Sequence, residues 1–205
     1  MIENALYIIA GYALLGAGIK YIDQAYDLGV FSKPKANLVA VLCGILMAYL
    51  IVTDPPSTAI FLAIVLSLAI TRKIDNIAFY IGTVLVILLP VFFDGVINIP
   101  WIPFGVLVLS GITDELGNDW ADKRTNKRLV DFSLGNGTKF KHKFAEKFFL
   151  HRFSMKFAVT FLVLFSFFEL TYFFAFIAFD LMYLIVEVYS FSIKVYTIDK
   201  MPAGH

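Results

Sequence analysis

The sequence predicts an all-α protein: a polytopic α-helical membrane bundle of about seven transmembrane helices. Hydrophobic residues make up 60% of the 205 residues and only 16% are charged, which is too little charge for the surface of a water-soluble domain. Apolar runs of about membrane-spanning length recur along the whole chain. Runs such as VLVILLPVFF do not alternate between apolar and polar residues, as the strands of a transmembrane barrel would.

Turn signals separate the expected spans. Pro55-Pro56 follows the second span, and Asp94-Gly95 precedes the fifth. The run from residue 157 to 193 is too long for one crossing at about 1.5 Å per residue. We divide it at Glu169–Thr171, with one long tilted helix as the alternative. The expected spans are roughly 5–22, 36–53, 57–71, 76–93, 97–113, 154–169 and 171–194.

The basic residues predict the orientation. In the seven-span arrangement all 17 Lys and Arg residues fall on one side, which the positive-inside rule makes cytoplasmic. A six-span arrangement would place Lys194 and Lys200 outside. We therefore expect an integral membrane protein, in the plasma membrane of a prokaryote, with its N-terminus outside and its C-terminus in the cytoplasm.

Residues 1–205 are expected to form a single transmembrane domain with a cytoplasmic cap loop over 114–153. Within this loop, four phenylalanines alternate with lysines at helical spacing, which predicts an amphipathic helix at the level of the lipid headgroups. These are Phe140, Phe144, Phe148 and Phe149. The net charge of +1 does not indicate a nucleic-acid partner, and we expect none.

Two acidic stretches close the first and fifth spans. The first carries Asp23 and Asp27 in KYIDQAYD, four residues apart and so on one helix face. Like charges at this spacing repel, so the pair needs a compensating cation or must lose one charge. Mg²⁺ would compensate them, because it takes oxygen ligands and bridges one or two carboxylates to a diphosphate. The alternative is two solvated acids at a helix end.

The second stretch, ITDELGNDWAD, carries Asp114, Glu115, Asp119 and Asp122, with Asn118 as a neutral oxygen ligand. Asp119 and Asp122 share a face if the helix continues, and a bend at Gly117 would turn Asp114 the same way. The alternative is a charged cytoplasmic loop. The acids adjoin the helix end, whereas the basic residues that topology requires come after them.

Candidate substrate-binding residues surround these acids. Arg72 and Lys73 lie in the turn between spans three and four, where they could hold a phosphate group. A basic turn is also what membrane topology alone requires. Lys20 precedes Asp23 by three residues. The basic candidates that follow the second stretch are Lys123 and Arg124.

The last expected helix carries Asp180, Tyr183 and Glu187 on one stripe. Carboxyl groups inside a membrane usually face a polar interior and mark function. Glu187 is a candidate general base or acceptor contact, and Asp180 a candidate substrate contact. A structural hydrogen bond is an equal alternative for Glu187.

This pattern resembles the UbiA superfamily of intramembrane prenyltransferases, whose two Asp-rich motifs lie at the cytoplasmic ends of helices four apart. DQAYD and DELGNDWAD stand in those places, and a basic residue of the turn at 72–73 stands where the family contacts diphosphate. The resemblance implies that Mg²⁺ and a prenyl diphosphate are held by Asp23, Asp27, Asp114, Asp119 and Asp122. The family usually has nine helices and a leading Asn in the first motif, where this chain has Ile19 or Lys20.

Two functions are therefore expected. The first is a Mg²⁺-dependent intramembrane prenyltransferase or prenyl diphosphate cyclase, in which the 22 Phe and 10 Tyr stabilise an allylic cation. Its expected catalytic residues are Asp23, Asp27, Asp114, Asp119 and Glu187, and its partners are the lipid bilayer, an isoprenoid diphosphate and an acceptor of unknown identity. The second is a cation-coupled transporter or channel that uses the same acids. The crowding of acids at one membrane face favours the enzyme.

Overall fold

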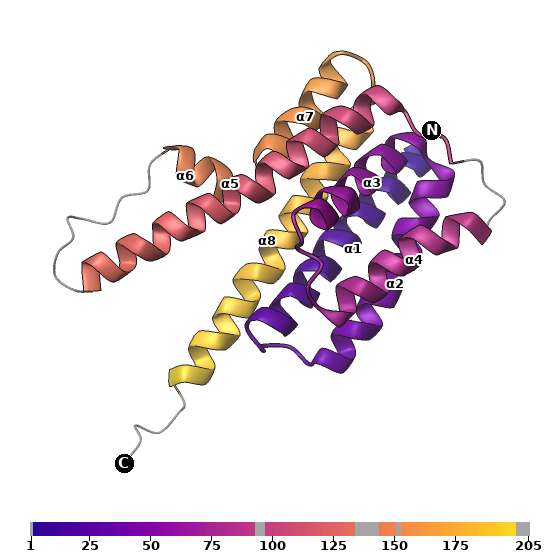
Figure 1. Cartoon of the computed structure of the whole chain (residues 1–205). Helices are drawn as coiled ribbons and strands as arrows, with labels where there is room; N and C mark the ends of the chain where they lie inside the picture. Colours follow the sequence, from indigo (N-terminus) through magenta and orange to yellow (C-terminus); the bar gives the residue numbers. More distant parts are fainter. Residues whose placement is uncertain (1, 93–96, 134–143, 151–152, 200–205) are drawn as a thin grey trace.

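The computed structural model describes residues 2–92, 97–133, 144–150 and 153–199. Within these ranges every regular element is an α-helix (Figure 1), which confirms the all-α class. The helices are α1 (Ile2–Asp27), α2 (Lys33–Thr53), α3 (Pro55–Ile70), α4 (Ile77–Phe92), α5 (Trp101–Ser133), α6 (Phe144–Leu150), α7 (Phe153–Leu164) and α8 (Leu170–Asp199).

The composition of these helices supports a membrane protein. Three segments are long and apolar enough to cross a membrane: Glu3–Asp27, Lys33–Thr53 and Leu170–Lys194. The helices α3, α4 and α7 are also apolar but shorter. Large apolar side chains such as Leu14 and Leu181 are exposed on the outer surface. Exposure of this kind along many helices is typical of a bundle surrounded by lipid.

The helices α1 and α8 run parallel and in close contact (Figure 1). Gly16 makes the approach possible, because a Cβ atom at this position would lie 2.1 Å from the carbonyl oxygen of Phe179. One turn further along both helices, Lys20 contacts Tyr183. The contacts advance in the same direction along both chains, so the two helices point the same way. Small residues allow such close packing between membrane helices.

Polar contacts join three helices at the end of the bundle remote from the acidic stretches. Asp54 caps α3, since one of its carboxylate oxygens accepts a hydrogen bond of 2.9 Å from the backbone N–H of Ser57. The Tyr172 hydroxyl of α8 donates to the other oxygen. The hydroxyls of Tyr12 and Ser57 lie 3.0 Å apart. This polar cluster joins α1, α3 and α8. An apolar core that includes Tyr12, Phe61, Leu107 and Leu162 packs beside it.

The region after the fifth span differs from the expected loop. The helix α5 continues without interruption through the second acidic stretch to Ser133. Gly117 does not bend it. A Cβ at this position would lie 2.1 Å from the ring of Phe149, so the glycine makes room for that ring. The expected cap loop over 114–153 is therefore helical over 114–133 and again in α6.

The expected amphipathic helix appears as the short α6. Phe148 and Phe149 contact protein rather than only lipid. The Phe149 ring centroid lies 6.1 Å from that of Trp120, and the Phe148 centroid lies 5.8 Å from that of Phe157. Phe140 lies outside the described residues.

The long apolar run near the C-terminus forms two helices, as expected. Ser166 ends α7 in the left-handed region, with φ of 60°. The Phe167 N–H donates to the Leu162 carbonyl at 2.9 Å, which is the hydrogen bond of a Schellman ending. The break between α7 and α8 therefore begins slightly before Glu169. The left-handed position is occupied by Ser and not by the usual Gly, so no clear signal in the sequence marks it.

Candidate functional site

A cavity of about 340 Å³ opens among seven helices at the end of the bundle that carries the acidic stretches. Its deeper wall is apolar and includes Met47, Val65, Val86, Phe176 and Phe179. The wall near the helix ends is charged. Its polar residues are Asp23, Asp27, Ser67, Lys73, Asp75, Asn76, Asp114, Glu115, Lys156, Asp180 and Tyr183. The cavity thus joins a charged end to an apolar interior.

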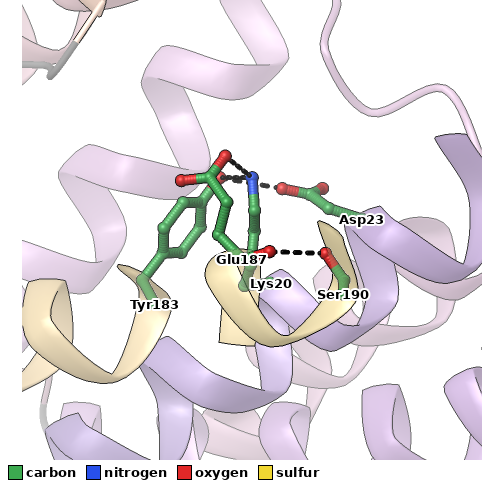
Figure 2. Close-up of polar contacts among 5 residues, drawn as sticks. All are labelled: Lys20, Asp23, Tyr183, Glu187 and Ser190. Carbon is green, nitrogen blue, oxygen red and sulfur yellow. Dashed lines mark hydrogen bonds and ion pairs between the residues drawn. The ribbon is translucent and has the colours of Figure 1, made fainter. Parts of the chain in front are cut away.

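The first acidic stretch reaches this cavity at the end of α1. Figure 2 shows the Tyr183 hydroxyl pointing to Asp23, to which it donates a hydrogen bond of 2.9 Å. Asp27 lies one turn further along α1 and is exposed. Asp75, in the turn between α3 and α4, also lines the cavity. Carboxylates from two elements therefore face one charged space.

An ion pair between α1 and α8 lies beside Asp23 (Figure 2). The Lys20 ammonium is 2.9 Å from a Glu187 carboxylate oxygen and 3.4 Å from the Tyr183 hydroxyl. It also lies 4.5 Å from the centroid of the Tyr183 ring. Lys20 is only 8% exposed, so its charge needs a counterion.

This pairing differs from the roles expected for both residues. Lys20 was expected to bind substrate and Glu187 to act in catalysis, but neither is among the residues that line the cavity. The cause is their pairing between α1 and α8, where Lys20 is buried and each charge compensates the other. The two residues therefore support Tyr183, which does line the cavity.

Asp114, in the second stretch, is 3% exposed. Its Oδ1 accepts a hydrogen bond of 2.9 Å from the Ser154 N–H, and its Oδ2 accepts one of 2.8 Å from the Met155 N–H. These N–H groups belong to the first turn of α7. Asp114 therefore caps α7 from a neighbouring helix, and both of its oxygens are engaged by protein.

Two other carboxylates of the second stretch, those of Asp119 and Asp122, do not line the cavity. Asp119 pairs with Lys73, and Asp122 is exposed. Because α5 stays helical, residues five and eight positions after Asp114 lie at different angles around it at about 100° per residue. The residues of this region that do not line the cavity are Asn118, Asp119, Asp122, Lys123 and Arg124. The expected metal set of this stretch is thus dispersed.

The basic turn between α3 and α4 places one lysine, Lys73, in the cavity wall. Arg72 is in the left-handed region, with φ of 58°, and the Lys73 N–H donates to the Leu68 carbonyl at 2.9 Å. Because of this Schellman ending of α3, the side chains of Arg72 and Lys73 point in different directions. Lys73 lines the cavity, whereas Arg72 is exposed and does not.

Lys156 also lines the cavity and was not among the expected site residues. Its ammonium lies 3.0 Å from the carboxylate of Asp180, which also lines the cavity. In the sequence, Lys156 is one of the 17 Lys and Arg residues that predict orientation. Its position inside the expected span 154–169 was the available signal, because a charge within an apolar span usually faces a polar interior.

The donor set can be tested against Mg²⁺. Among the described residues, no group of three or more His, Cys, Asp or Glu side chains is arranged to hold a metal ion. Mg²⁺ does not require one, because it commonly keeps waters and binds through one or two carboxylates plus substrate phosphates. Asp23 and Asp27 are two carboxylates that line the cavity, and Mg²⁺ binding by them stays a prediction.

Comparisons with protein-family models, curated proteins and solved structures found no match to this chain.

Proposed function

We propose that the protein is an intramembrane enzyme that binds an isoprenoid diphosphate with Mg²⁺ and transfers or cyclises its isoprenoid chain. The cavity is the observation that carries this proposal. Its charged end and apolar interior match an amphiphile with an anionic head and a long apolar tail. Both acidic stretches contribute to its charged end, as the resemblance to the UbiA superfamily requires.

The residues of the cavity divide into two groups. Lys73 and Lys156 bind the diphosphate, while Asp23 and Asp27 would hold Mg²⁺. When bound, the ion neutralises the charge that develops on the leaving diphosphate.

The apolar wall performs the remaining tasks. Met47 and Val86 hold the chain and exclude water, which strengthens the electrostatic contacts at the charged end. Phe176, Phe179 and the Tyr183 ring present aromatic faces to positive charge that forms on the isoprenoid. An acceptor would enter the same space.

Purified protein in detergent tests this function by titration with farnesyl and geranylgeranyl diphosphate. We expect binding in Mg²⁺ and at least tenfold weaker binding in EDTA, a difference of about 1.4 kcal/mol. Farnesol and pyrophosphate, which each lack one half of the amphiphile, should bind more weakly than the intact compound. Equal binding with and without the isoprenoid tail would contradict the proposal.

Lys73→Met and Arg72→Gly form a matched pair of variants that tests the proposed diphosphate contact. Lys73 lines the cavity, so its loss should weaken diphosphate binding by about tenfold or more. Arg72 is exposed and has φ of 58°, a conformation that Gly adopts without strain. Arg72→Gly should therefore keep both the turn and the binding affinity.

Seven membrane crossings by α1–α5, α7 and α8 belong to the same proposal. The parallel course of α1 and α8 supports it, because the first and seventh of alternating crossings run the same way. With Cys43 replaced by Ser, a cysteine at Asn98 should react with an impermeant reagent from outside, and one at Lys123 only from inside. Reaction of both from one side would exclude this arrangement.

A cation-coupled transporter or channel is the second candidate. The pairs Lys20–Glu187 and Lys156–Asp180 place charges along α8, as an ion pathway would. Cation flux into proteoliposomes, together with no binding of isoprenoid diphosphates, would favour it over the enzyme.

A further inference from the structure

The second acidic stretch contributes to the cavity through α7. We propose that Lys156 binds the anionic group of the ligand and that Asp114 is its positioning residue, not a metal ligand. The inference deepens the proposed function in one respect, since it takes the ligand head to be a diphosphate.

The hydrogen bonds of Asp114 define its role. Each carboxylate oxygen accepts one backbone N–H, from Ser154 and from Met155, and the side chain is almost fully buried. Hydrogen bonds from a helix N-terminus to a carboxylate are charge-assisted. The positive end of the α7 dipole compensates the negative charge of Asp114. The charge of the carboxylate is therefore partly compensated, and both of its oxygens are oriented by protein.

Lys156 follows the capped residues directly. Because Asp114 fixes the N–H groups of Ser154 and Met155, it fixes the first turn of α7 and the direction in which Lys156 leaves it. The Lys156 side chain is 25% exposed and that of its partner Asp180 is 47% exposed. Solvent screens an ion pair with this much exposure, so the Lys156 ammonium can exchange Asp180 for another anionic partner.

Lys156 and Lys73 together match a diphosphate. Both line the cavity, and they come from α7 and from the turn that follows α3. Each forms an ion pair with a carboxylate, Asp180 for Lys156 and Asp119 for Lys73. A diphosphate carries more negative charge than a carboxylate and offers several acceptor oxygens, so it competes for both ammonium groups.

Inorganic pyrophosphate in EDTA isolates this contact, because it requires neither metal nor isoprenoid. We expect Lys156→Met to lower pyrophosphate affinity by at least tenfold. Lys147→Met is the matched control, since Lys147 is exposed on α6 and does not line the cavity, and its affinity should stay within twofold of the wild type. Loss of affinity in both variants alike, or no measurable pyrophosphate binding by the wild type, would overturn the proposal.

Asp114→Asn then separates positioning from metal binding. The amide keeps one acceptor oxygen but sets an N–H₂ group against the second backbone N–H. We expect lower pyrophosphate affinity in EDTA, with little further loss when Lys156→Met is added. The Mg²⁺ concentration that gives half-maximal farnesyl diphosphate binding should change less than twofold. A tenfold rise in that concentration with unchanged pyrophosphate affinity would make Asp114 a metal ligand.

Ser154→Pro provides a second route if the Asp114 variant does not fold. Proline is tolerated in the first turn of a helix, and it removes one N–H donor while leaving the Asp114 carboxylate intact. Lower pyrophosphate affinity supports positioning through α7, and unchanged affinity overturns it.

The binding experiments distinguish failure of the proposed function from failure of the role proposed for Lys156. If farnesyl diphosphate does not bind while pyrophosphate binding depends on Lys156, the proposed function fails and the role of Lys156 stands. If farnesyl diphosphate binds in Mg²⁺ while Lys156→Met leaves pyrophosphate affinity unchanged, the role of Lys156 fails and the proposed function stands.

Discussion

The two acidic stretches look alike in sequence and differ in structure. On α1, Asp23 and Asp27 are one turn apart and both line the cavity. On α5, Asp114 caps α7, Asp119 pairs with Lys73, and Asp122 is exposed. The neighbours of each carboxylate make the difference. Acids gathered in sequence act together only where helical spacing gives them one face and that face lines a common space.

The largest effect should come from removing the cap. Asp114→Ala leaves two backbone N–H groups of α7 without their acceptor, which costs on the order of 2–4 kcal/mol of folding free energy. Asp122→Ala, on the same helix but exposed, should change stability by less than about 0.5 kcal/mol. The measurement is the midpoint of thermal unfolding of each variant in detergent. Equal midpoints would mean that Asp114 is not a structural residue.

The next effect concerns metal-dependent binding by the first stretch. Asp23→Asn and Asp27→Asn should each weaken Mg²⁺-dependent binding of farnesyl diphosphate by tenfold or more, about 1.4 kcal/mol or above. Removing both should be less than additive, because either loss disables a shared ion.

Asp122→Asn is the control for these variants and should bind like the wild type. If Asp122→Asn loses as much affinity as Asp27→Asn, the contrast between the two stretches disappears.

The smallest effect should come from Asp119. The side chains of Asp119 and Lys73 are 39% and 35% exposed, and a pair in this environment contributes about 0.2–1 kcal/mol. Asp119→Asn should leave the Mg²⁺ requirement unchanged and should not weaken pyrophosphate binding, because Lys73 keeps its charge. A loss of Mg²⁺-dependent binding as large as that of Asp23→Asn would restore Asp119 as a metal ligand.

Local patterns predicted most of the helices, whereas the function of the candidate site stays a prediction. Apolar runs and proline turns placed most helix ends within a few residues, and Asp23, Asp27, Lys73, Asp114 and Asp180 do line one cavity. The course of α5 was not predicted, since a polar helix and a polar loop have similar compositions. Gly117 resembled a bend because nothing nearby in the sequence indicates the Phe149 ring.

The partners of the charged residues could not be predicted either. Asp114 is bonded to N–H groups 40 and 41 positions later, and Lys20 pairs with Glu187 near the other end of the described chain. Such contacts depend on which helices become neighbours. A hydrophobic pattern specifies that a helix is buried, but it does not specify against which other helix.

The parallel pairing of α1 with α8 has a consequence for biosynthesis. During translation α1 emerges first and α8 last among the described helices, so Lys20 remains without Glu187 until the other helices have been made. Until then its long side chain can extend toward the headgroups. The Tyr183 contact to Asp23 also forms only at this final step. The nascent protein therefore has no finished binding cavity, and ligand that binds the completed cavity would stabilise only chains whose synthesis has passed α8.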